Sequence, residues 1–266
     1  MHLPLSSAAV PRLVVVDECT STNDLLVASA AQEPDLSVLV TDRQTAGRGR
    51  LRREWIAPAG ESLAISVLVR PVTADGVPLE PARFGWMPLL AGLAMARAVA
   101  SVVPADRVGL KWPNDVQIDG LKVSGVLAEV AGTGDAIVVG AGVNLAIPAD
   151  RLPTPVSTSL VVAGAEERGD ALADAVLSAY LLAFRALYSA LLAHGGDAVS
   201  SGLLADVRHA CTTLGREVAV ELPDGTTLRG VATGIDASGR LEVRSSADGR
   251  TSSLSVGDVT HVRPLA

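Results

Sequence analysis

A short segment from residue 43 to residue 53 concentrates side chains that bind anions. It reads RQTAGRGRLRR, with five arginines and two glycines in eleven residues of a chain whose formal net charge is −7. Glycine lets backbone N–H groups approach a ligand closely, and the arginine fork binds carboxylate or phosphate oxygens in pairs. The segment therefore indicates an anion pocket. A solvated basic loop or a nucleic-acid site is the alternative, although RNA sites usually add aromatic stacking partners and only 3% of this chain is aromatic.

Lysine is rare in this sequence and is confined to one region. The chain has twenty arginines but only two lysines, Lys111 and Lys122. Arginine solubilises a surface equally well, so lysine at these positions indicates a need for a compact ammonium group. Lys111 opens the run KWPND, in which Pro113 fixes the backbone and favours extended geometry at Trp112. Asp115 then has two interpretations that stay open, a Mg²⁺ ligand or a carboxylate that neutralises an arginine.

The common nucleotide and hydrolase motifs are absent from the sequence. No GxxxxGK[ST], GxGxxG or GxSxG pattern occurs. GAGVN at 140–144 follows the apolar run AIVV, but alone it is a weak glycine-rich signal that a tight turn explains equally well. Any nucleotide chemistry must therefore use a different template.

The hydrophobic pattern predicts strands and helices around these segments. Strands are expected at 12–17, 36–41, 61–70, 122–130 and 136–145, and helices at 24–31, 83–103, 170–191 and 198–211. Residues 21–24 supply N-cap chemistry for the first helix, and Asp170 caps the long one, which Gly195 and Gly196 stop. Residues 42–53 show no periodicity and are expected to form a loop.

The texture of the sequence changes near residues 211–215. From Gly215 onwards, short alternating runs are separated by PDG, ASG and ADG turns, which predicts a small all-β module of the SH3-like type. We therefore expect a catalytic or binding domain over residues 1–212 and a second domain over 213–266.

The composition sets the class of protein. With 266 residues, 48% of them hydrophobic and 19% charged, the chain can bury a core and is too apolar for disorder. Its negative charge argues against a general nucleic-acid or membrane-surface binder. The N-terminus lacks a basic stretch ahead of an apolar core, and proline or charges interrupt the apolar stretches 84–103 and 171–193, so we expect a cytoplasmic protein. Cys19 and Cys211 have neither disulfide-framework nor zinc-site spacing.

Together, the motifs resemble those of biotin protein ligases, in the same order. They are STND at 21–24, QTAGRGR at 44–50 followed by Trp55, LKWPND at 110–115, KVSGVLAEV at 122–130 and GAGVNL at 140–145. The resemblance runs from about residue 12 to the C-terminus. It implies an α+β fold, with a mixed β-sheet catalytic domain and flanking helices of the class II synthetase-like, SH2-like kind, and a C-terminal SH3-like β-barrel.

The resemblance also implies a two-step reaction. Biotin and MgATP would give biotinyl-5′-AMP and pyrophosphate, and biotin would then pass to a lysine of the biotin carboxyl carrier domain of an acyl-CoA carboxylase. Joining a carboxylate to a phosphate brings two anions together, so cations must offset their repulsion. ATP and Mg²⁺ are the implied cofactors, and monomers and homodimers both occur in the family.

Family motifs carry over to this chain residue by residue. The catalytic residues would be Lys122, Arg48 and Arg50. The biotin site would comprise Ser21, Thr22, Asn23, Gln44, Gly47, Arg48, Gly49, Arg50, Lys122 and Gly125. The ATP site would comprise Arg48, Arg50, Arg53, Trp55, Lys111, Asn114, Asp115, Gly142 and Asn144, with Asp115 as the metal ligand. Small neutral groups such as Ser21 suit the ureido ring of biotin, which has two donors and one acceptor.

Two features qualify the resemblance. The family loop usually reads GRGRxGR, whereas Arg52 stands at the position of the last glycine here, which affects the expected role of Arg53. The twenty residues before Ser21 are too few for the DNA-binding domain of some family members, so we expect no specific DNA binding. A lipoate ligase or acyltransferase of the same fold, and a biotin-binding protein without turnover, are the alternative functions.

Overall fold

A mixed β-sheet forms the centre of the larger part of the molecule. The structure is a computed structural model that describes residues 1–50, 53–222, 224–255 and 258–261. In this part of the chain a seven-stranded sheet has the order β1-β2-β5-β9-β8-β7-β6. Its strands are β1 (Arg12–Val15), β2 (Ser37–Thr41), β5 (Ser62–Val69), β6 (Val108–Lys111), β7 (Asp115–Ile118), β8 (Leu121–Ala131) and β9 (Ala136–Asn144). Only the β1–β2 pair among these is parallel.

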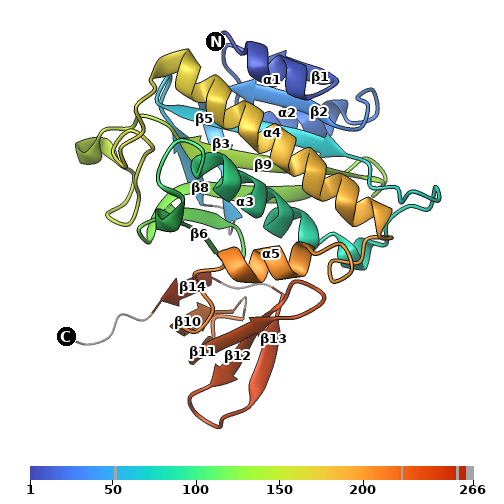
Figure 1. The fold of residues 1–266 in the computed structure, drawn as a ribbon, viewed down its shortest axis with the longest axis vertical. Coiled ribbons are helices and arrows are strands. Elements are labelled where there is room, and N and C mark those ends of the chain that lie inside the picture. The colour runs from blue at the N-terminus through green and yellow to red at the C-terminus, as the bar shows by residue number, and fades with distance from the viewer. Residues whose placement is uncertain (51–52, 223, 256–257, 262–266) are drawn as a thin grey trace.

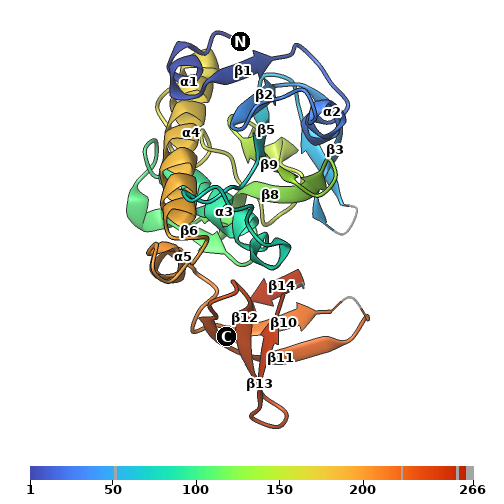
Figure 2. The ribbon, with the colours of Figure 1, turned by 90° about the vertical axis from the view of Figure 1, so that its right-hand side faces the viewer.

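Helices cover the two faces of this sheet unequally. The long helices α3 (Trp86–Val99) and α4 (Gly169–Ala193) lie together on one face, with α1 (Pro4–Ala9) against α4, whereas α2 (Thr22–Ser29) lies on the other face (Figures 1 and 2). Short 3₁₀ helices occur at Pro81–Arg83, Ala105–Arg107 and Ala149–Arg151. The face that carries α2 is therefore covered less completely by helices than the face that carries α3 and α4.

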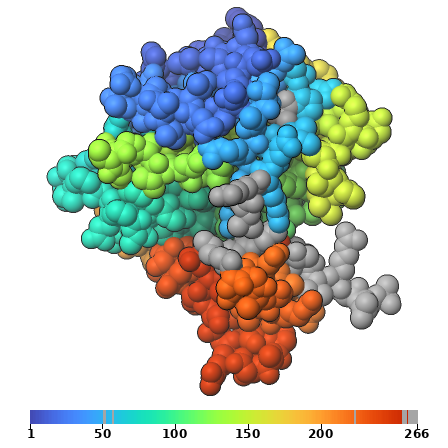
Figure 3. Space-filling model, turned by 180° about the vertical axis from the view of Figure 1, so that it is seen from behind, coloured from blue at the N-terminus to red at the C-terminus, as the bar shows by residue number. Residues whose placement is uncertain are grey.

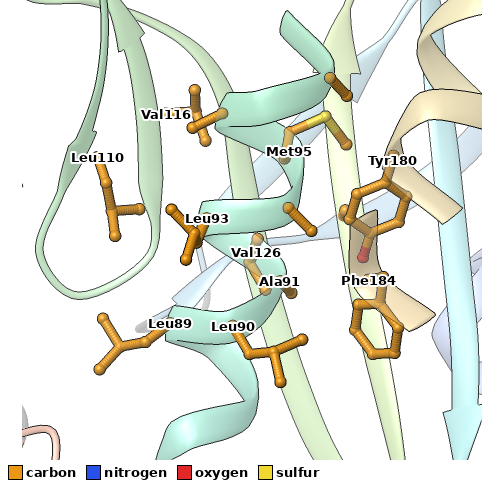
Figure 4. Packing of buried hydrophobic residues seen from close by; sticks show 14 of the residues in the cluster. Leu89, Leu90, Ala91, Leu93, Met95, Leu110, Val116, Val126, Tyr180 and Phe184 are labelled. Atoms are coloured by element: carbon orange, nitrogen blue, oxygen red, sulfur yellow. The ribbon is translucent and has the colours of Figure 1, made fainter. Parts of the chain in front are cut away.

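The main core lies between the sheet and the two long helices. Leu90 and Met95 of α3 pack between Val126 of β8 and the rings of Tyr180 and Phe184 on α4 (Figure 4). Helix α4 is long and apolar enough to cross a membrane by length and composition. Because one face of α4, with Leu177, Tyr180 and Phe184, is buried in the core cluster that includes α3 and the sheet, it serves here as a core helix.

The ends of the predicted helices need correction. Helix α2 begins at Thr22 instead of residue 24, and the Ser21 hydroxyl is its N-cap, accepting from the Asp24 backbone N–H. Asp170 does not cap α4, because its carboxylate accepts from the backbone N–H of His2. Tertiary contact thus overrides the local capping signal.

Glycines with positive φ angles mark the end of α4 and the start of the next helix. Helix α4 ends as predicted before Gly195 and Gly196, whose φ angles are +62° and +77°. The following helix, α5 (Leu203–Ala210), is shorter than the predicted 198–211, since Gly202 adopts a φ of +80° immediately before it.

The expectation of a structureless loop at 42–53 is wrong. Strands β3 (Gln44–Arg48) and β4 (Glu54–Ala57) form an antiparallel hairpin in which Gly47 is paired with Trp55. The hairpin escapes sequence reasoning because it stands off the main sheet, so it has no alternating buried face to leave a period-two pattern. Arg52, which replaces the usual glycine, lies outside the described residues.

The C-terminal part is a small antiparallel β domain, as the sequence predicts. Its sheet has the order β13-β12-β11-β10-β14, built from β10 (Glu217–Glu221), β11 (Thr227–Ile235), β12 (Leu241–Ser245), β13 (Thr251–Leu254) and β14 (Asp258–His261). The turn between β11 and β12 docks on the larger part, where Trp86 Nε1 donates to Ala237 O at 3.1 Å and Trp112 Nε1 donates to Gly239 O at 3.0 Å. The two parts therefore share an ordered interface.

Candidate functional site

A cavity of about 700 Å³ lies on the face of the sheet opposite α3 and α4. Strands β5, β8 and β9 form its floor, and its walls are the start of α2, the β3–β4 hairpin and the β6–β7 hairpin. Val259 of β14 also contributes, so the C-terminal domain closes one side. Figure 3 shows this side of the molecule, with the N-terminal part in blue above the C-terminal domain in orange and red.

The cavity brings together nearly all residues singled out from the sequence. Its lining includes Ser21, Thr22, Asn23, Gln44, Arg48, Gly49, Arg50, Arg53, Trp55, Lys111, Asn114, Asp115, Lys122, Gly125, Gly142 and Asn144. Gly47 is the exception. A Cβ at Gly47 would lie 2.4 Å from both Gln44 Nε2 and the Trp55 carbonyl oxygen, so this glycine permits close pairing of β3 with β4 and does not face the cavity.

The segment GAGVN is a strand instead of a tight turn. Residues 140, 142 and 144 of β9 share one face, because side chains alternate along a strand. A Cβ at Gly140 would lie 2.3 Å from Asn23 Oδ1, and a Cβ at Gly142 would lie 2.2 Å from Trp55 Cε2. The two glycines therefore provide the flat floor on which Asn23 and Trp55 rest.

At one end of the cavity, the amide of Asn23 is fixed by three partners. Its Nδ2 donates to Glu129 Oε2 at 2.7 Å and to the Leu127 carbonyl at 3.3 Å, while its Oδ1 accepts from the Ser66 hydroxyl at 2.6 Å. Since a carboxylate and a carbonyl can only accept, Nδ2 must face them. Both donors of Asn23 are thus used within the protein.

The neighbouring Gln44 is oriented in the opposite sense. Its Oε1 accepts from the Thr22 backbone N–H at 2.9 Å and lies 3.2 Å from the Thr22 hydroxyl. What this side chain can offer a ligand is therefore its amide N–H groups. The N-terminal turn of α2 and the start of β3 position these groups together.

Arg48 and Arg50 reach different parts of the cavity. Arg48 Nη2 forms ion pairs with Asp24 and, at 3.0 Å, with Glu129. Burial lowers the pKa of Arg48, but the charges of Glu129 and Asp24 outweigh it and the net shift is upward. Arg50 Nη1 instead donates to Asn114 Oδ1 at 3.2 Å.

The KWPND segment forms a hairpin at the other end of the cavity. Lys111 pairs with Asp115 across the turn, which contains a cis Trp112–Pro113 peptide bond. Asn114 Nδ2 donates to the Val126 carbonyl at 2.7 Å, so the amide that receives Arg50 is itself fixed. The hairpin thus presents Lys111, Asn114 and Asp115 to one space.

The charge partner of Asp115 is a lysine. Lys122 Nζ lies 2.5 Å from Asp115 Oδ1 and 5.8 Å from the ring centroid of Trp55. The expectation that Asp115 neutralises an arginine is therefore not met among the described contacts. No cluster of three or more His, Cys, Asp or Glu side chains suited to a metal occurs in the described residues. The buried Asn144 Oδ1 has no hydrogen-bond partner there, so an oxygen donor remains on the floor.

Two polar residues that hold the lining residue Asn23 in place, Ser66 and Glu129, were missed from the sequence. Also missed were the polar lining residues Glu54, Gln117, Asp119, Thr154 and Ser157. Ser66 is fully buried in β5, and Glu129 lies on β8, two residues beyond Leu127. Ser66 interrupts an apolar strand, and Glu129 belongs to the run KVSGVLAEV, so a polar side chain in a predicted buried strand was the available signal.

Comparison with known proteins finds a family match for each of the two parts of the chain. Residues 15–144 match the model of the "Biotin/lipoate A/B protein ligase family", and residues 213–262 match that of the "Biotin protein ligase C terminal domain". The chain is 39% identical to the biotin–[acetyl-CoA-carboxylase] ligase of Mycobacterium tuberculosis, over 95% of this chain and 90% of that protein. It is 34% identical to the Paracoccus denitrificans ligase of the same name, over 77% and 82%.

Solved structures agree with these sequence relatives. The biotin protein ligase of Aquifex aeolicus in complex with biotin and ATP superimposes with a TM-score of 0.71 at 25% identity, covering 95% of this chain and 99% of that one. The Leishmania major enzyme in complex with biotinyl-5-AMP gives a TM-score of 0.54 at 27% identity, over 92% and 99%. The α+β fold predicted from the sequence is thereby confirmed.

Proposed function

Because this chain belongs to the biotin/lipoate A/B protein ligase family and is an ATP-dependent biotin protein ligase, we propose that the cavity described above carries both steps of that activity. The main support for this proposal is the lining of the cavity. Neutral hydrogen-bonding groups of Thr22, Asn23 and Gln44 lie at one end, and the cationic groups of Arg50 and Lys122 line the same cavity. Relatives named as biotin ligases favour this function over a lipoate ligase or a binding protein without turnover.

The neutral end suits the ureido ring of biotin. Gln44 has its oxygen occupied by Thr22 and offers N–H donors, which match the ureido carbonyl. Asn23 has both N–H groups occupied and can only accept, which matches a ureido N–H. Opposite orientations of two amides thus provide one donor and one acceptor for a buried polar ring.

The cationic groups suit the reacting anions. A biotin carboxylate oxygen attacks the α-phosphorus of ATP, the new O–P bond forms, and the bond to the β-phosphate oxygen breaks to release pyrophosphate. Lys122 would hold the carboxylate and the phosphate together, and Arg50, fixed through Asn114, would bind phosphate oxygens. In the second step, a carrier lysine amine attacks the acyl carbon and AMP leaves.

Magnesium fits the nucleotide side of this arrangement. Mg²⁺ is commonly held by one or two carboxylates together with substrate phosphates, and Asp115 and the partnerless Asn144 Oδ1 are oxygen donors that line the cavity. When bound, the ion would supply positive charge to the phosphate oxygens. Asp115 also forms an ion pair with Lys122 and thereby holds the lysine at the site.

The remaining assignments follow from the same function. The partner would be the biotin carboxyl carrier domain of an acyl-CoA carboxylase, and the protein would act in the cytoplasm. The catalytic domain would span residues 1–212, with the remainder forming the C-terminal domain. Val259 in the cavity wall supports a direct contribution of that domain to the site.

A label-transfer assay tests the function. The protein is incubated with biotin, MgATP and a carrier domain, and biotinylation is followed with streptavidin while pyrophosphate release is measured in parallel. We expect both signals to depend on biotin and to persist in excess lipoate. Folded protein that transfers no biotin, or that prefers lipoate, would overturn the proposal.

A further inference from the structure

Asn23 lies across a single row of the central sheet. Gly140 of β9 is in register with Ser66 of β5 on one side and with Leu127 of β8 on the other. The Asn23 amide rests on Gly140, accepts from Ser66 and donates to the Leu127 carbonyl. Because Gly140 has no side chain, the Asn23 amide packs directly on the backbone of this row. Figure 2 shows strands β5, β9 and β8 side by side.

Glu129 lies on the same face of β8 as Leu127, because the two are separated by one residue. One oxygen of its carboxylate, Oε2, accepts from Asn23 Nδ2 at 2.7 Å and from Arg48 Nη2 at 3.0 Å. A single atom thus connects the residue that faces the neutral end of the cavity to the first arginine of the GRGR segment. Its side chain is 27% exposed, so the contact is partly shielded from water.

The same contact sets the direction of the arginine fork. Among the residues that the structure describes, both carboxylate partners of Arg48 bind Nη2. The donors on Nε and Nη1 therefore stay available for an anionic ligand. Asp24 is the second partner, and among the described residues its carboxylate binds Arg48 but is not a hydrogen-bond partner of the Asn23 amide.

We propose that Glu129 is a positioning residue for biotin binding, which holds the Asn23 amide in its acceptor orientation and aims the Arg48 fork at the ligand carboxylate through one shared oxygen. The proposal rests on the function proposed above. It assigns a role to a carboxylate that repels the substrate carboxylate by charge and is useful only because it acts through Asn23 and Arg48.

Two isosteric variants separate the two connections. Glu129→Gln weakens both, whereas Asp24→Asn weakens only the hold on Arg48. Each is titrated calorimetrically with biotin and with its alcohol analogue, in which a hydroxyl replaces the carboxylate. We expect Glu129→Gln to raise the Kd of the alcohol by about tenfold, from the value of a hydrogen bond to a charged group, and the Kd of biotin by a larger factor, because biotin also loses the aim of Arg48. Asp24→Asn should raise the Kd of biotin alone.

Further measurements exclude a merely structural role. The Kd of ATP and the thermal midpoint of Glu129→Gln should stay close to wild type, and the substitution should change the Kd of the alcohol little in an Asn23→Ala background. An unchanged Kd of the alcohol in Glu129→Gln, an equal effect of Asp24→Asn on it, or a parallel loss of ATP binding would overturn the inference. Wild-type protein that binds no biotin would overturn the proposed function itself.

Discussion

Two glycines on one strand should control the affinities for two different substrates. Gly140 supports Asn23 and Gly142 supports Trp55, and a Cβ at either position would lie within 2.3 Å of the residue above it. Real Cβ atoms do not approach heavy atoms so closely, so alanine must displace the overlying side chain. We expect Gly140→Ala to raise the KM for biotin and Gly142→Ala to raise the KM for ATP.

The magnitude follows from the cost of overpacking. Inserting a methyl group into a close-packed site costs about 1–3 kcal/mol. If that cost falls on ligand binding, it corresponds to a rise in KM of between about fivefold and about 150-fold. Neither glycine has a positive φ angle, so backbone strain adds nothing to this figure.

Steady-state pyrophosphate release measures both KM values for each variant. The two variants control for each other, because each adds one methyl group to the same face of β9, two residues apart. Gly85→Ala is a neutral control, since its Cβ would be 3.9 Å from the nearest atom, the Ser238 carbonyl oxygen. If both variants raise the two KM values by the same factor, the division of the floor into two ends is wrong.

Three further predictions concern single groups. Lys122→Ala should slow adenylate formation by at least about a hundredfold in a pyrophosphate assay, because the lysine holds the reacting anions. The unfolding free energy should change little, since the Lys122–Asp115 ion pair is partly exposed. Near-normal turnover would contradict the role given to the lysine. Trp112→Phe removes the donor to the Gly239 carbonyl and should lower the unfolding free energy in urea by about 1–3 kcal/mol, so an unchanged midpoint would show that this bond does not hold the domains. Burial raises the pKa of Asp174, but hydrogen bonds from Ser6 and Leu5 outweigh burial and lower this pKa below its ordinary value of 3.8. The ionised carboxylate therefore stabilises the fold fully above pH 3.8, and this stabilisation is lost as the pH falls through the lower pKa of the folded state. Asp174→Asn should abolish this part of the acid dependence of the unfolding free energy.

The sequence by itself determined the family, the order of the motifs and the elements with strong periodicity. Helix α4 was predictable from its apolar spacing and the glycines that follow it, and the C-terminal β domain from its turns. The two lysines could be identified as candidate site residues from the sequence alone, because the other twenty basic residues are all arginines. These features are local, since each is recorded in the spacing or the rarity of neighbouring residues.

Only the tertiary structure decided how the motifs combine. The β3–β4 hairpin left no periodic signal, and although a strand over GAGVN was predicted, only the structure shows that Asn23 and Trp55 rest on its glycines. Glu129 and Asn23 are 106 positions apart in the chain, and they meet because strand register aligns Gly140 with Leu127. Register is a property of paired strands, so a single sequence specifies which residues are polar but not which of them share one carboxylate oxygen.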